Sequence, residues 1–538
     1  MQTDLLPFIH TATGNTIGDG LTRSVMRFAH KEAIIFQQRR WTYQQLDLAV
    51  NRVANRLLTT GLQQGDRVAA YGKNSDAYLI LWLACARAGM IHVPINFALV
   101  KDELSYLLEQ SGAKAVFVDD TLAEHVAAVQ ESTSLAFIGR LRAETGHTDT
   151  LDILSIALSQ GNDQLPDVVV NNTDIVQILY TSGTTSQPKG AMHTHRSFMN
   201  EYTSCIHHLD LRDTDRSLAA LPLYHSAQMH VFTMPALMIG SLTYLMEAPL
   251  PERVFETIIR EKINSFFAPP TVWIGLLRHS AFDQYDLSSL KNIYYGASIM
   301  PAPIAAELAQ RLAGSCLYNC YGQSEIAPLA TVLGPDEHAG RLSSAGKPIM
   351  SVATRIVDPL TMVDCAPGER GEIVHRSPHL MVGYWDKPDE TREAFEGGWF
   401  HSGDLAYADE EGFIYIVDRI KDVVNTGGVL VASRDVEEAL YLHSAVAEVA
   451  VIGTPHDKWI EAITAVVVLK PDEDATVFEL TEHCHQHLAA FKVPKSIIFA
   501  DGLPKNTAGK LLKRTLREQY SEAHFEDRLE EQLEERLS

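Results

Sequence analysis

The sequence is poor in positive charge, in cysteine and in long apolar runs, and each shortage excludes a class of protein. Its 45 Lys and Arg face 68 Asp and Glu, which gives a net charge of −23, and such a field repels nucleic-acid phosphates and anionic membrane surfaces. Six cysteines are spread over 538 residues without a CxxC pair, a pattern that fits a reducing cytoplasm better than a disulfide framework. We therefore expect no nucleic-acid partner and no secreted disulfide scaffold.

No apolar run is long and continuous enough to suggest a membrane span. Residues 226–246 carry no charge, but Gln228, His230, Pro235 and Gly240 interrupt them, so we expect a buried helix followed by a strand. The first twelve residues lack the basic start and the apolar run of a signal peptide. These features predict a cytoplasmic protein without an integral membrane segment.

What the sequence does contain is enough apolar material for a large core. Hydrophobic residues make up 46% of the chain and charged residues 21%, and at about 150 residues per domain the length predicts about three or four structural units. Short apolar runs alternate with amphipathic stretches such as residues 42–58, which predicts α/β layers with a parallel sheet. The expected strands are residues 67–71, 115–118, 175–180, 265–268 and 292–295.

The pattern of expected strands, helices and turns changes twice in the last third of the sequence. From about residue 344 the strands become shorter and Gly-rich turns appear, as at residues 367–371, which predicts a β-barrel-like region. After Asp418 a helix, two strands and a second helix are expected, enough for a small α+β unit; they are residues 436–441, 446–452, 463–469 and 480–488.

The predicted organisation is a large α/β N-terminal domain with a small α+β C-terminal domain. The large domain would hold two α/β sheet subdomains and the barrel-like subdomain. In the acidic tail, Phe525, Leu529, Leu533 and Leu537 recur every four residues, which favours a packing or self-association helix, as in a homodimer, over a membrane anchor of the wrong charge. The predicted boundaries are 1–420 for the large domain, 421–520 for the mobile C-terminal domain and 521–538 for the helical tail.

The segment with the most informative chemistry is residues 180–190, Tyr-Thr-Ser-Gly-Thr-Thr-Ser-Gln-Pro-Lys-Gly, directly after an apolar strand. Glycine lets backbone amides turn toward phosphate oxygens, hydroxyls donate further bonds, and Lys189 adds a mobile positive charge. It is not a Walker loop, because Pro188 precedes the Lys and Gly190 stands where Ser or Thr would be needed. A plain Ser/Thr-rich surface loop is the alternative. The predicted anion-binding residues are Thr181, Ser182, Gly183, Thr184, Thr185 and Lys189.

At these residues the sequence resembles the adenylate-forming superfamily of acyl-CoA synthetases, aryl-CoA ligases, peptide-synthetase adenylation domains and luciferases. The likeness spans nearly the whole chain. The sequence departs from the family pattern at three places. Ser186 stands where the family usually has Gly, and Ser324 where Thr is commoner. Val429-Leu430 stands where an acidic residue and Asn often follow the Gly427-Gly428 pair. Further motifs occur in the family's order: Leu221-Pro-Leu-Tyr-His225, Tyr295-Gly-Ala-Ser298, Tyr321-Gly-Gln-Ser-Glu325, Ser402-Gly-Asp404, Asp418-Arg-Ile-Lys-Asp422 and Pro504-Lys-Asn-Thr-Ala-Gly-Lys510.

The resemblance implies a reaction in two steps. A carboxylate attacks the α-phosphate of ATP and releases pyrophosphate, and the thiol of coenzyme A then displaces AMP. Lys510 is the implied adenylation lysine, Glu325 the implied ligand of Mg²⁺, and Thr184 a third implied catalytic residue. The simpler alternatives are a solvated Lys510 and an acid at a helix N-terminus for Glu325.

Other positions are implied to bind ATP. Tyr321 would stack on adenine, although core packing is the default for an isolated Tyr. Asp404, assisted by Arg419, would accept from the ribose hydroxyls, with a turn-capping Asp as the alternative. Ser324 would contact the α-phosphate. The remaining implied ATP contacts are Gly296, Ala297, Ser298, Asn319 and Gly322.

The resemblance also implies a moving C-terminal domain and an acyl site. Lys421 would be the hinge, and the Gly427-Gly428 loop would meet the pantetheine arm of coenzyme A in the second step. The acyl site would involve His225, Met229 and Gly296. Residues 221–246 hold no Asp or Glu, whereas amino-acid-activating relatives usually place an Asp there, so a hydrophobic uncharged acid is favoured.

The expected activity is that of an AMP-forming acyl-CoA synthetase for a medium- or long-chain fatty acid. Alternatives are an aryl or short-chain acid, transfer to a carrier-protein thiol, a luciferase-like oxygenase, and a non-catalytic nucleotide-binding relative. Two histidine-rich segments, residues 193–195 and 483–487, lack a matched second ligand pair at zinc spacing and are not expected to bind zinc.

Overall fold

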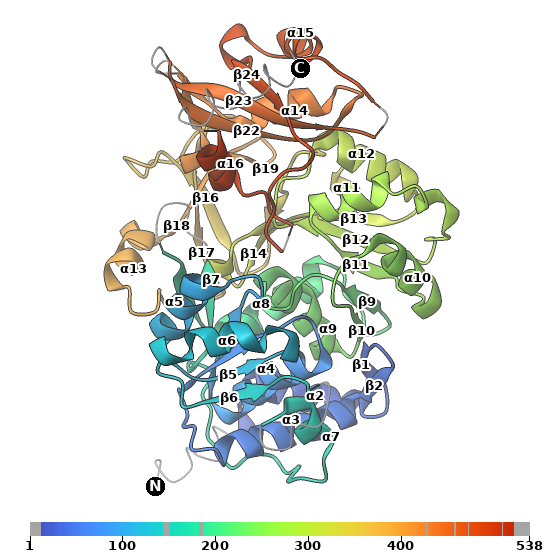
Figure 1. The fold of residues 1–538 in the computed structure, drawn as a ribbon, viewed down its shortest axis with the longest axis vertical. Helices are drawn as coiled ribbons and strands as arrows, with labels where there is room; N and C mark the ends of the chain where they lie inside the picture. Colours follow the sequence, from blue (N-terminus) through green and yellow to red (C-terminus); the bar gives the residue numbers. More distant parts are fainter. Residues whose placement is uncertain are drawn as a thin grey trace, which may run out of the picture.

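The computed structural model contains four β-sheets, with nine, six, four and five strands (Figure 1). The six-stranded and nine-stranded sheets lie in the blue-to-yellow part of the molecule, and the five-stranded sheet of the C-terminal segment lies at the top in orange and red. The structure describes residues 12–143, 151–181, 187–426, 429–456, 459–471, 473–507 and 509–520.

The six-stranded sheet is parallel except at one edge, where β7 and β8 form an antiparallel hairpin. In this part of the chain apolar strands alternate with amphipathic helices. Each helix can form the right-handed crossover that connects two parallel strands. In spatial order the strands are β6 (Phe137–Arg140), β5 (Ala113–Val118), β3 (Arg67–Tyr71), β4 (Ile91–Ile95), β7 (Ile175–Thr181) and β8 (Lys189–Thr194).

The nine-stranded sheet has a parallel centre and antiparallel strands at both ends. In spatial order its strands are β15 (Lys347–Pro348), β14 (Leu329–Leu333), β13 (Cys316–Gly322), β12 (Asn292–Gly296), β11 (Ser265–Phe267), β9 (Arg216–Ala219), β10 (Leu242–Leu245), β1 (Glu32–Phe36) and β2 (Arg39–Thr42).

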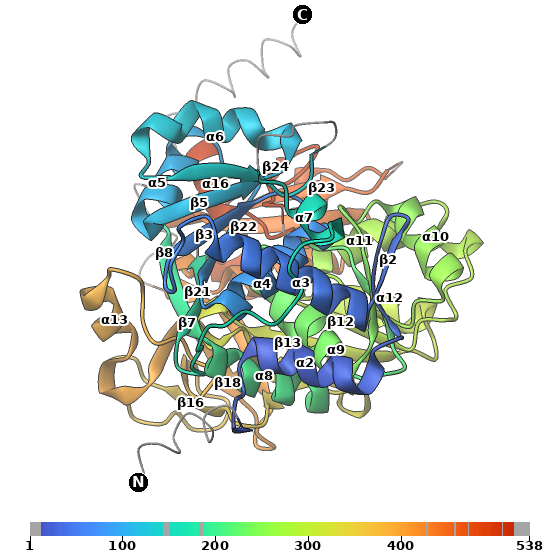
Figure 2. The ribbon, with the colours of Figure 1, turned by 90° about the horizontal axis from the view of Figure 1, so that it is seen from below.

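Helices α3 (Tyr43–Leu58) and α4 (Asp76–Ala88) fill the space between these two sheets (Figure 2). Every residue of α4 is buried, which explains why this helix is apolar all round rather than on one face. Helix α3 begins with a capping box, in which the side chains of Thr42 and Gln45 each accept from the other's backbone amide. This shared layer fixes the two sheets relative to each other.

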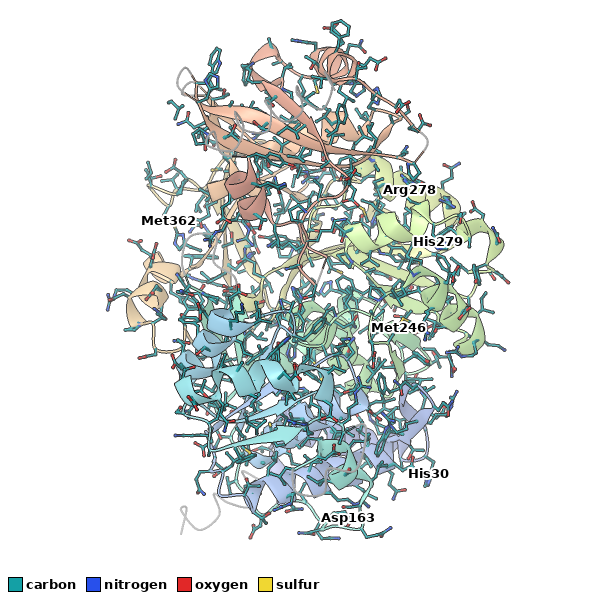
Figure 3. The ribbon with its side chains drawn as sticks, viewed as in Figure 1. His30, Asp163, Met246, Arg278, His279 and Met362 are labelled. Carbon is teal, nitrogen blue, oxygen red and sulfur yellow. The ribbon has the colours of Figure 1, made fainter. Side chains whose placement is uncertain are left out.

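Of the remaining helices, α2, α8 and α9 pack on one another, and α8 contacts both β8 of the six-stranded sheet and β14 of the nine-stranded sheet. Arg278, at the end of α11 and labelled in Figure 3, makes a two-pronged ion pair with Glu307 of α12, at 2.5 and 2.8 Å. The other helices are α2 (Ile17–Phe28), α5 (Lys101–Ser111), α6 (Ala123–Val129), α7 (Ile153–Leu158), α8 (His195–His208), α9 (Met234–Ile239), α10 (Pro251–Glu261), α11 (Pro270–Arg278), α12 (Ala302–Arg311) and α13 (Pro388–Ala394).

Two antiparallel sheets follow in the last third of the chain. The region expected to be barrel-like is a four-stranded antiparallel sheet, β16 (Ala353–Val357), β17 (Gly371–Arg376), β18 (Phe400–Ala408) and β19 (Ile414–Arg419). The C-terminal sheet is covered by α14 (Ser433–Tyr441), α15 (Val477–His487) and α16 (Lys513–Gln519). Its strands are β20 (Val424–Thr426), β21 (Val429–Val431), β22 (Val446–His456), β23 (Ile460–Leu469) and β24 (Ser496–Phe499).

The predicted fold class, a large α/β unit followed by a smaller α+β unit, is confirmed. Residues 226–246 form buried helix and then strand as predicted, but the first part is a π-helix, Ala227–Thr233, which runs directly into α9 and is followed by β10. Within the part of the chain that the structure describes, no helix has both the length and the apolar character needed to cross a bilayer. The predicted tail, 521–538, lies outside the described residues.

Candidate active site

The β7–β8 hairpin holds both ends of the predicted anion loop. Thr181, the last residue of β7, pairs directly with Lys189, the first residue of β8. The Lys189 Nζ lies 5.2 Å from the centre of the Tyr384 ring, a distance at which a cation is attracted by the ring face. Ser182, Gly183, Thr184 and Thr185 lie outside the described residues.

A segment distant in sequence runs along the free edge of this hairpin. Its backbone continues the sheet: the Met192 amide donates to the Gly383 carbonyl at 2.9 Å, and the Trp385 amide donates to the Gly190 carbonyl at 2.7 Å. This pairing places Tyr384 beside Lys189 and directs its hydroxyl to Glu325, where it donates to Oε1 at 3.0 Å. Sequence reasoning missed Tyr384, because no motif marks it.

Glu325 lies at a junction between the two large sheets. It belongs to a single 3₁₀ turn, Ser324–Ile326, directly after β13, and it is only 9% exposed. Its Oε1 accepts from Tyr384 and, at 3.3 Å, from the Thr181 hydroxyl. Burial together with the Glu325 charge raises the pKa of Tyr384, which keeps that hydroxyl a donor. A buried carboxylate oriented by hydroxyls fits the oxygen ligands that Mg²⁺ prefers.

Asp404 is the centre of a second buried cluster. The register of β18 and β19 sets Asp404 opposite Arg419, and the Arg419 Nε lies 2.6 Å from its Oδ1. Its Oδ2 accepts from the Tyr321 hydroxyl and from the Gln323 amide, each at 2.7 Å. Burial and the nearby Asp404 charge raise the pKa of Tyr321, so the hydroxyl donates. Gln323, which sequence reasoning quoted within a motif but gave no role, therefore helps to orient Asp404.

The strands that carry these residues approach one another closely. A Cβ added at Gly322 would lie 1.7 Å from the Pro328 carbonyl oxygen, and one added at Gly296 would lie 2.1 Å from the Cys320 carbonyl oxygen. Only Gly fits these two positions. Beside Gly296, Ala297 adopts a left-handed φ of 63°, and Ser298 follows it in the same turn. Such a conformation costs of order 1–3 kcal/mol and is concentrated at functional sites.

Asn319 and Ser324 have protein partners next to these turns. The Asn319 amide donates to the Ser344 carbonyl at 2.7 Å. The Ser324 hydroxyl lies 2.9 Å from the Ser226 hydroxyl, and the Ser324 carbonyl accepts from His193 Nε2 at 2.7 Å. These contacts join the turn of Glu325 to the segment that carries His225.

Of the three predicted acyl-site residues, Met229 lies on the π-helix, His225 precedes it, and Gly296 ends β12. His225 is partly buried, and burial together with the nearby Lys510 charge lowers its pKa to about 4, so this side chain is neutral at pH 7. Met229 is buried within the π-helix, a helix type often found at functional sites. Phe232 stacks on Phe267 with 4.3 Å between ring centres, so aromatic rings back this part of the helix.

Lys510, which belongs to the C-terminal unit, lies near His225. It ends a tight turn in which its amide donates to Asn506 Oδ1 at 2.8 Å. Lys510 keeps contact with solvent, yet the surrounding protein and the Arg419 charge lower its pKa, while Asp404, Asp422 and Glu325 act in the opposite direction. Lys510 therefore lies within electrostatic reach of both acidic clusters.

The structure thus brings together most of the residues selected from the sequence. Glu325 and His225 come from segments that follow strands of the nine-stranded sheet, Asp404 and Arg419 from the four-stranded sheet, and Lys510 from the C-terminal turn. Lys421 lies in the short turn Ile420–Asp422 between β19 and β20, and Gly427 and Gly428 lie outside the described residues.

The two histidine-rich segments have ordinary structural contacts. His195 Nδ1 accepts from the Ile17 amide at 3.2 Å, and His483 Nε2 donates to the Ala439 carbonyl at 2.8 Å. Across the described ranges, no group of three or more His, Cys, Asp or Glu side chains is arranged to hold a metal ion.

Comparisons with known proteins agree with this geometry. The family described as AMP-binding enzyme matches residues 21–385, and the AMP-binding enzyme C-terminal domain matches residues 435–510. A feruloyl-CoA synthase from Amycolatopsis sp is 36% identical over 94% of this chain and 99% of its own length. The long-chain-fatty-acid–CoA ligase FadD13 of Mycobacterium tuberculosis is 33% identical over 90% of this chain and 93% of its own.

Solved structures give the same result. The anthranilate CoA ligase AuaEII, in complex with anthranoyl-AMP, superposes with a TM-score of 0.88 at 26% identity, over 94% of this chain and 98% of the other. MatB from Rhodopseudomonas palustris, with bound ATP, superposes with a TM-score of 0.86 at 28% identity, over 94% and 99% of the two chains. The similarity therefore extends through both the large unit and the C-terminal unit.

Proposed function

The chain belongs to the AMP-binding enzyme family, and from this membership we propose that it is an acid–thiol ligase, an AMP-forming acyl-CoA synthetase. It would join a hydrophobic carboxylic acid to ATP, release pyrophosphate, and pass the acyl group from AMP to coenzyme A. The observation that carries this proposal is that Lys510 lies within electrostatic reach of Glu325 and of the Asp404–Arg419 ion pair.

The difficulty of the first step is that both reactants are anions. Fixed positive charge must hold them in contact, so catalysis would consist mostly of positioning and electrostatic stabilisation. Lys510 from the C-terminal turn and Arg419 from β19 would supply that charge, and Lys189 would add to it at the end of the anion loop. Mg²⁺, held by Glu325, would neutralise phosphate charge when bound.

The nucleotide would lie between the two acidic clusters. Asp404 is acceptor-only when ionised, and its carboxylate retains lone pairs beyond those used by Tyr321, Gln323 and Arg419, so a ribose diol can donate to it. We place the α-phosphate near Ser324 and the β- and γ-phosphates near the loop between Thr181 and Lys189. With its hydroxyl fixed by Asp404, Tyr321 offers its ring face to adenine.

The acid would bind beside His225 and the π-helix. Residues 221–246 hold no acidic side chain and His225 is neutral at pH 7, so no group of this segment would recognise a substrate ammonium. We propose a medium- or long-chain fatty acid as the substrate. An aryl acid is the second candidate, supported by the stacked rings of Phe232 on the π-helix and Phe267 on β11 and by the feruloyl-CoA synthase relative.

The C-terminal unit is proposed to serve both steps by moving about Lys421. In the structure it presents Lys510 to the site, which suits adenylate formation. Rotation would replace that turn by the Gly427-Gly428 loop for the thiol step, and closure would keep water from the mixed anhydride. All six cysteines are described and free, which supports a reducing compartment, and we place the enzyme in the cytoplasm.

The proposal is tested by supplying the protein with MgATP, coenzyme A and a panel of fatty, aryl and short-chain acids. Pyrophosphate, AMP and thioester should form together, and only when an acid is present. Release of ADP, or no acid-dependent pyrophosphate with any acid, would reject the activity. A panel in which aryl acids alone are used would correct the substrate, and thioester formed only on a carrier protein would correct the acceptor.

A further inference from the structure

The turn that carries Lys510 is held from two sides by the large unit. On one side the Thr271 hydroxyl donates to the Gly509 carbonyl at 2.7 Å. Gly509 has a left-handed φ of 79°, and a Cβ there would lie 2.5 Å from the Thr271 Oγ1, so the close approach depends on Gly. On the other side Thr507 lies between Tyr224 and Asn96.

The proton arrangement around Thr507 follows from its single hydroxyl hydrogen. The Thr507 hydroxyl donates to Asn96 Oδ1 at 3.0 Å, so Tyr224 must donate to the Thr507 oxygen. Burial raises the pKa of Tyr224 to about 12, which keeps that phenol protonated. The result is a directed chain of two hydrogen bonds, Tyr224 to Thr507 to Asn96, that crosses from the large unit to the Lys510 turn and back.

The two partners of Thr507 belong to segments that border the acyl site. Tyr224 directly precedes His225, and its ring meets the edge of Phe97, the neighbour of Asn96, with 5.7 Å between ring centres. Two backbone hydrogen bonds link Asn506 to the end of the turn: the Gly509 amide donates to the Asn506 carbonyl at 2.9 Å, and the Asn506 amide donates to the Lys510 carbonyl at 2.9 Å. A hydrogen bond that fixes Thr507 therefore also fixes the position of the Lys510 backbone.

We propose that Thr507 is a positioning residue for adenylate formation, because it accepts from Tyr224 and donates to Asn96 and so docks the Lys510 turn onto the large unit. This role rests on the proposed function and goes beyond it, since Thr507 touches neither reactant in that scheme. Because these contacts join the C-terminal unit to the large unit, they would break when the C-terminal unit rotates. The hydroxyl would then matter for the first step and not for the second.

The variant Thr507→Val removes the hydroxyl and keeps the shape. Loss of two hydrogen bonds should slow acid-dependent pyrophosphate release about 10- to 30-fold at saturating ATP and acid, with the KM for ATP changed by less than about threefold. Thioester formation from supplied acyl-adenylate should stay within about twofold of the parent protein. Thr507→Ser, which restores the hydroxyl, should recover most of the lost rate.

Thr481→Val is the matched control. Thr481 lies on α15 in the same unit, and its hydroxyl donates only locally, to the Val477 carbonyl at 2.8 Å. This variant should leave both half-reactions unchanged. Tyr224→Phe should act in the same direction as Thr507→Val, and the two changes together should cost little more than one, because they remove a shared hydrogen bond.

A second measurement does not depend on activity. In the nucleotide-free protein, backbone hydrogen exchange in the peptide over residues 504–512 should be faster in Thr507→Val than in the parent protein or in Thr481→Val. A parent protein that adenylates no acid would reject the proposed function, and the exchange data would still decide on the docking role. Unchanged exchange, unchanged adenylation, or equal loss of both half-reactions would each overturn the role of Thr507.

Discussion

Replacing Tyr384 with Phe should weaken the response of the enzyme to Mg²⁺ about tenfold. The Tyr384 hydroxyl donates to Glu325 Oε1 at 3.0 Å, and a hydrogen bond to a charged group contributes about 1.5–3 kcal/mol, which corresponds to about 10- to 150-fold in an equilibrium constant. The low end applies, because Tyr384 is only partly buried and Thr181 still donates to the same oxygen at 3.3 Å. The substitution keeps the aromatic ring beside the Lys189 ammonium.

The assay is the Mg²⁺ dependence of acid-dependent pyrophosphate release at saturating ATP. Tyr384→Phe should need about tenfold more Mg²⁺ for half-maximal rate, in line with the usual effect of removing a group that orients a metal ligand. Tyr415→Phe is the matched control, because Tyr415 on β19 also donates to a carboxylate, that of Asp409 at 3.2 Å, but outside the cluster around Glu325. It should behave as the parent protein.

The result that would refute this reasoning is a Mg²⁺ dependence in Tyr384→Phe that matches Tyr415→Phe. A double variant sharpens the test. Glu325→Gln should itself impair adenylation strongly, and adding Tyr384→Phe to it should then change little, because both act through one carboxylate. Fully additive losses would show that Tyr384 acts elsewhere.

Two further predictions concern Lys510. Lys510→Ala should abolish adenylate formation yet spare thioester formation from supplied acyl-adenylate; equal loss of both in rapid-mixing assays would contradict the division of labour between the two steps. The pH profile follows from the lowered pKa of Lys510. A lysine with a lowered pKa loses its proton at lower pH than a free one, so adenylation should fall as the pH rises through the Lys510 pKa, which lies below 10.5. The thiol step should show no such fall. A third prediction concerns His225, whose pKa burial lowers to about 4. The adenylation rate should therefore show no step from His225 between about pH 7 and 6. A fall of the rate in that range that vanishes in His225→Ala would contradict the neutral state assigned to this residue.

Much of the fold follows from local sequence signals. The strand at residues 67–71 and the helix from Tyr43 to Leu58 match the prediction closely, because alternation of short apolar runs and amphipathic stretches has one stable solution in α/β layers. Residues 226–246 were assigned correctly as helix and strand, but nothing in their composition distinguishes the π-helix from an α-helix.

The candidate site could be located from motifs but not assembled from them. Asp404 and Arg419 are fifteen positions apart, and only the register of β18 and β19 sets them opposite each other; a slip of one residue would turn Asp404 to the other face of the sheet. Tyr384 reaches Glu325 because residues 382–385 extend an edge of a sheet whose neighbouring strand lies some two hundred residues earlier. Long-range pairings of this kind leave no local trace in a sequence.

The electrostatics of the site also indicate what it is for. Burial, and after it the Arg419 charge, lowers the pKa of Lys510 despite the nearby acids, so the two cations disfavour each other, and Asp404 is already engaged by Arg419, Tyr321 and Gln323. A fold shaped for stability alone would gain by placing an acid against Lys510 or by removing one cation. An anion bound between Lys510 and Arg419 would convert this repulsion into attraction and raise the pKa of Lys510. The unfavourable arrangement of the free protein is therefore itself an argument that the site binds a negatively charged reactant, as joining a carboxylate to a phosphate requires.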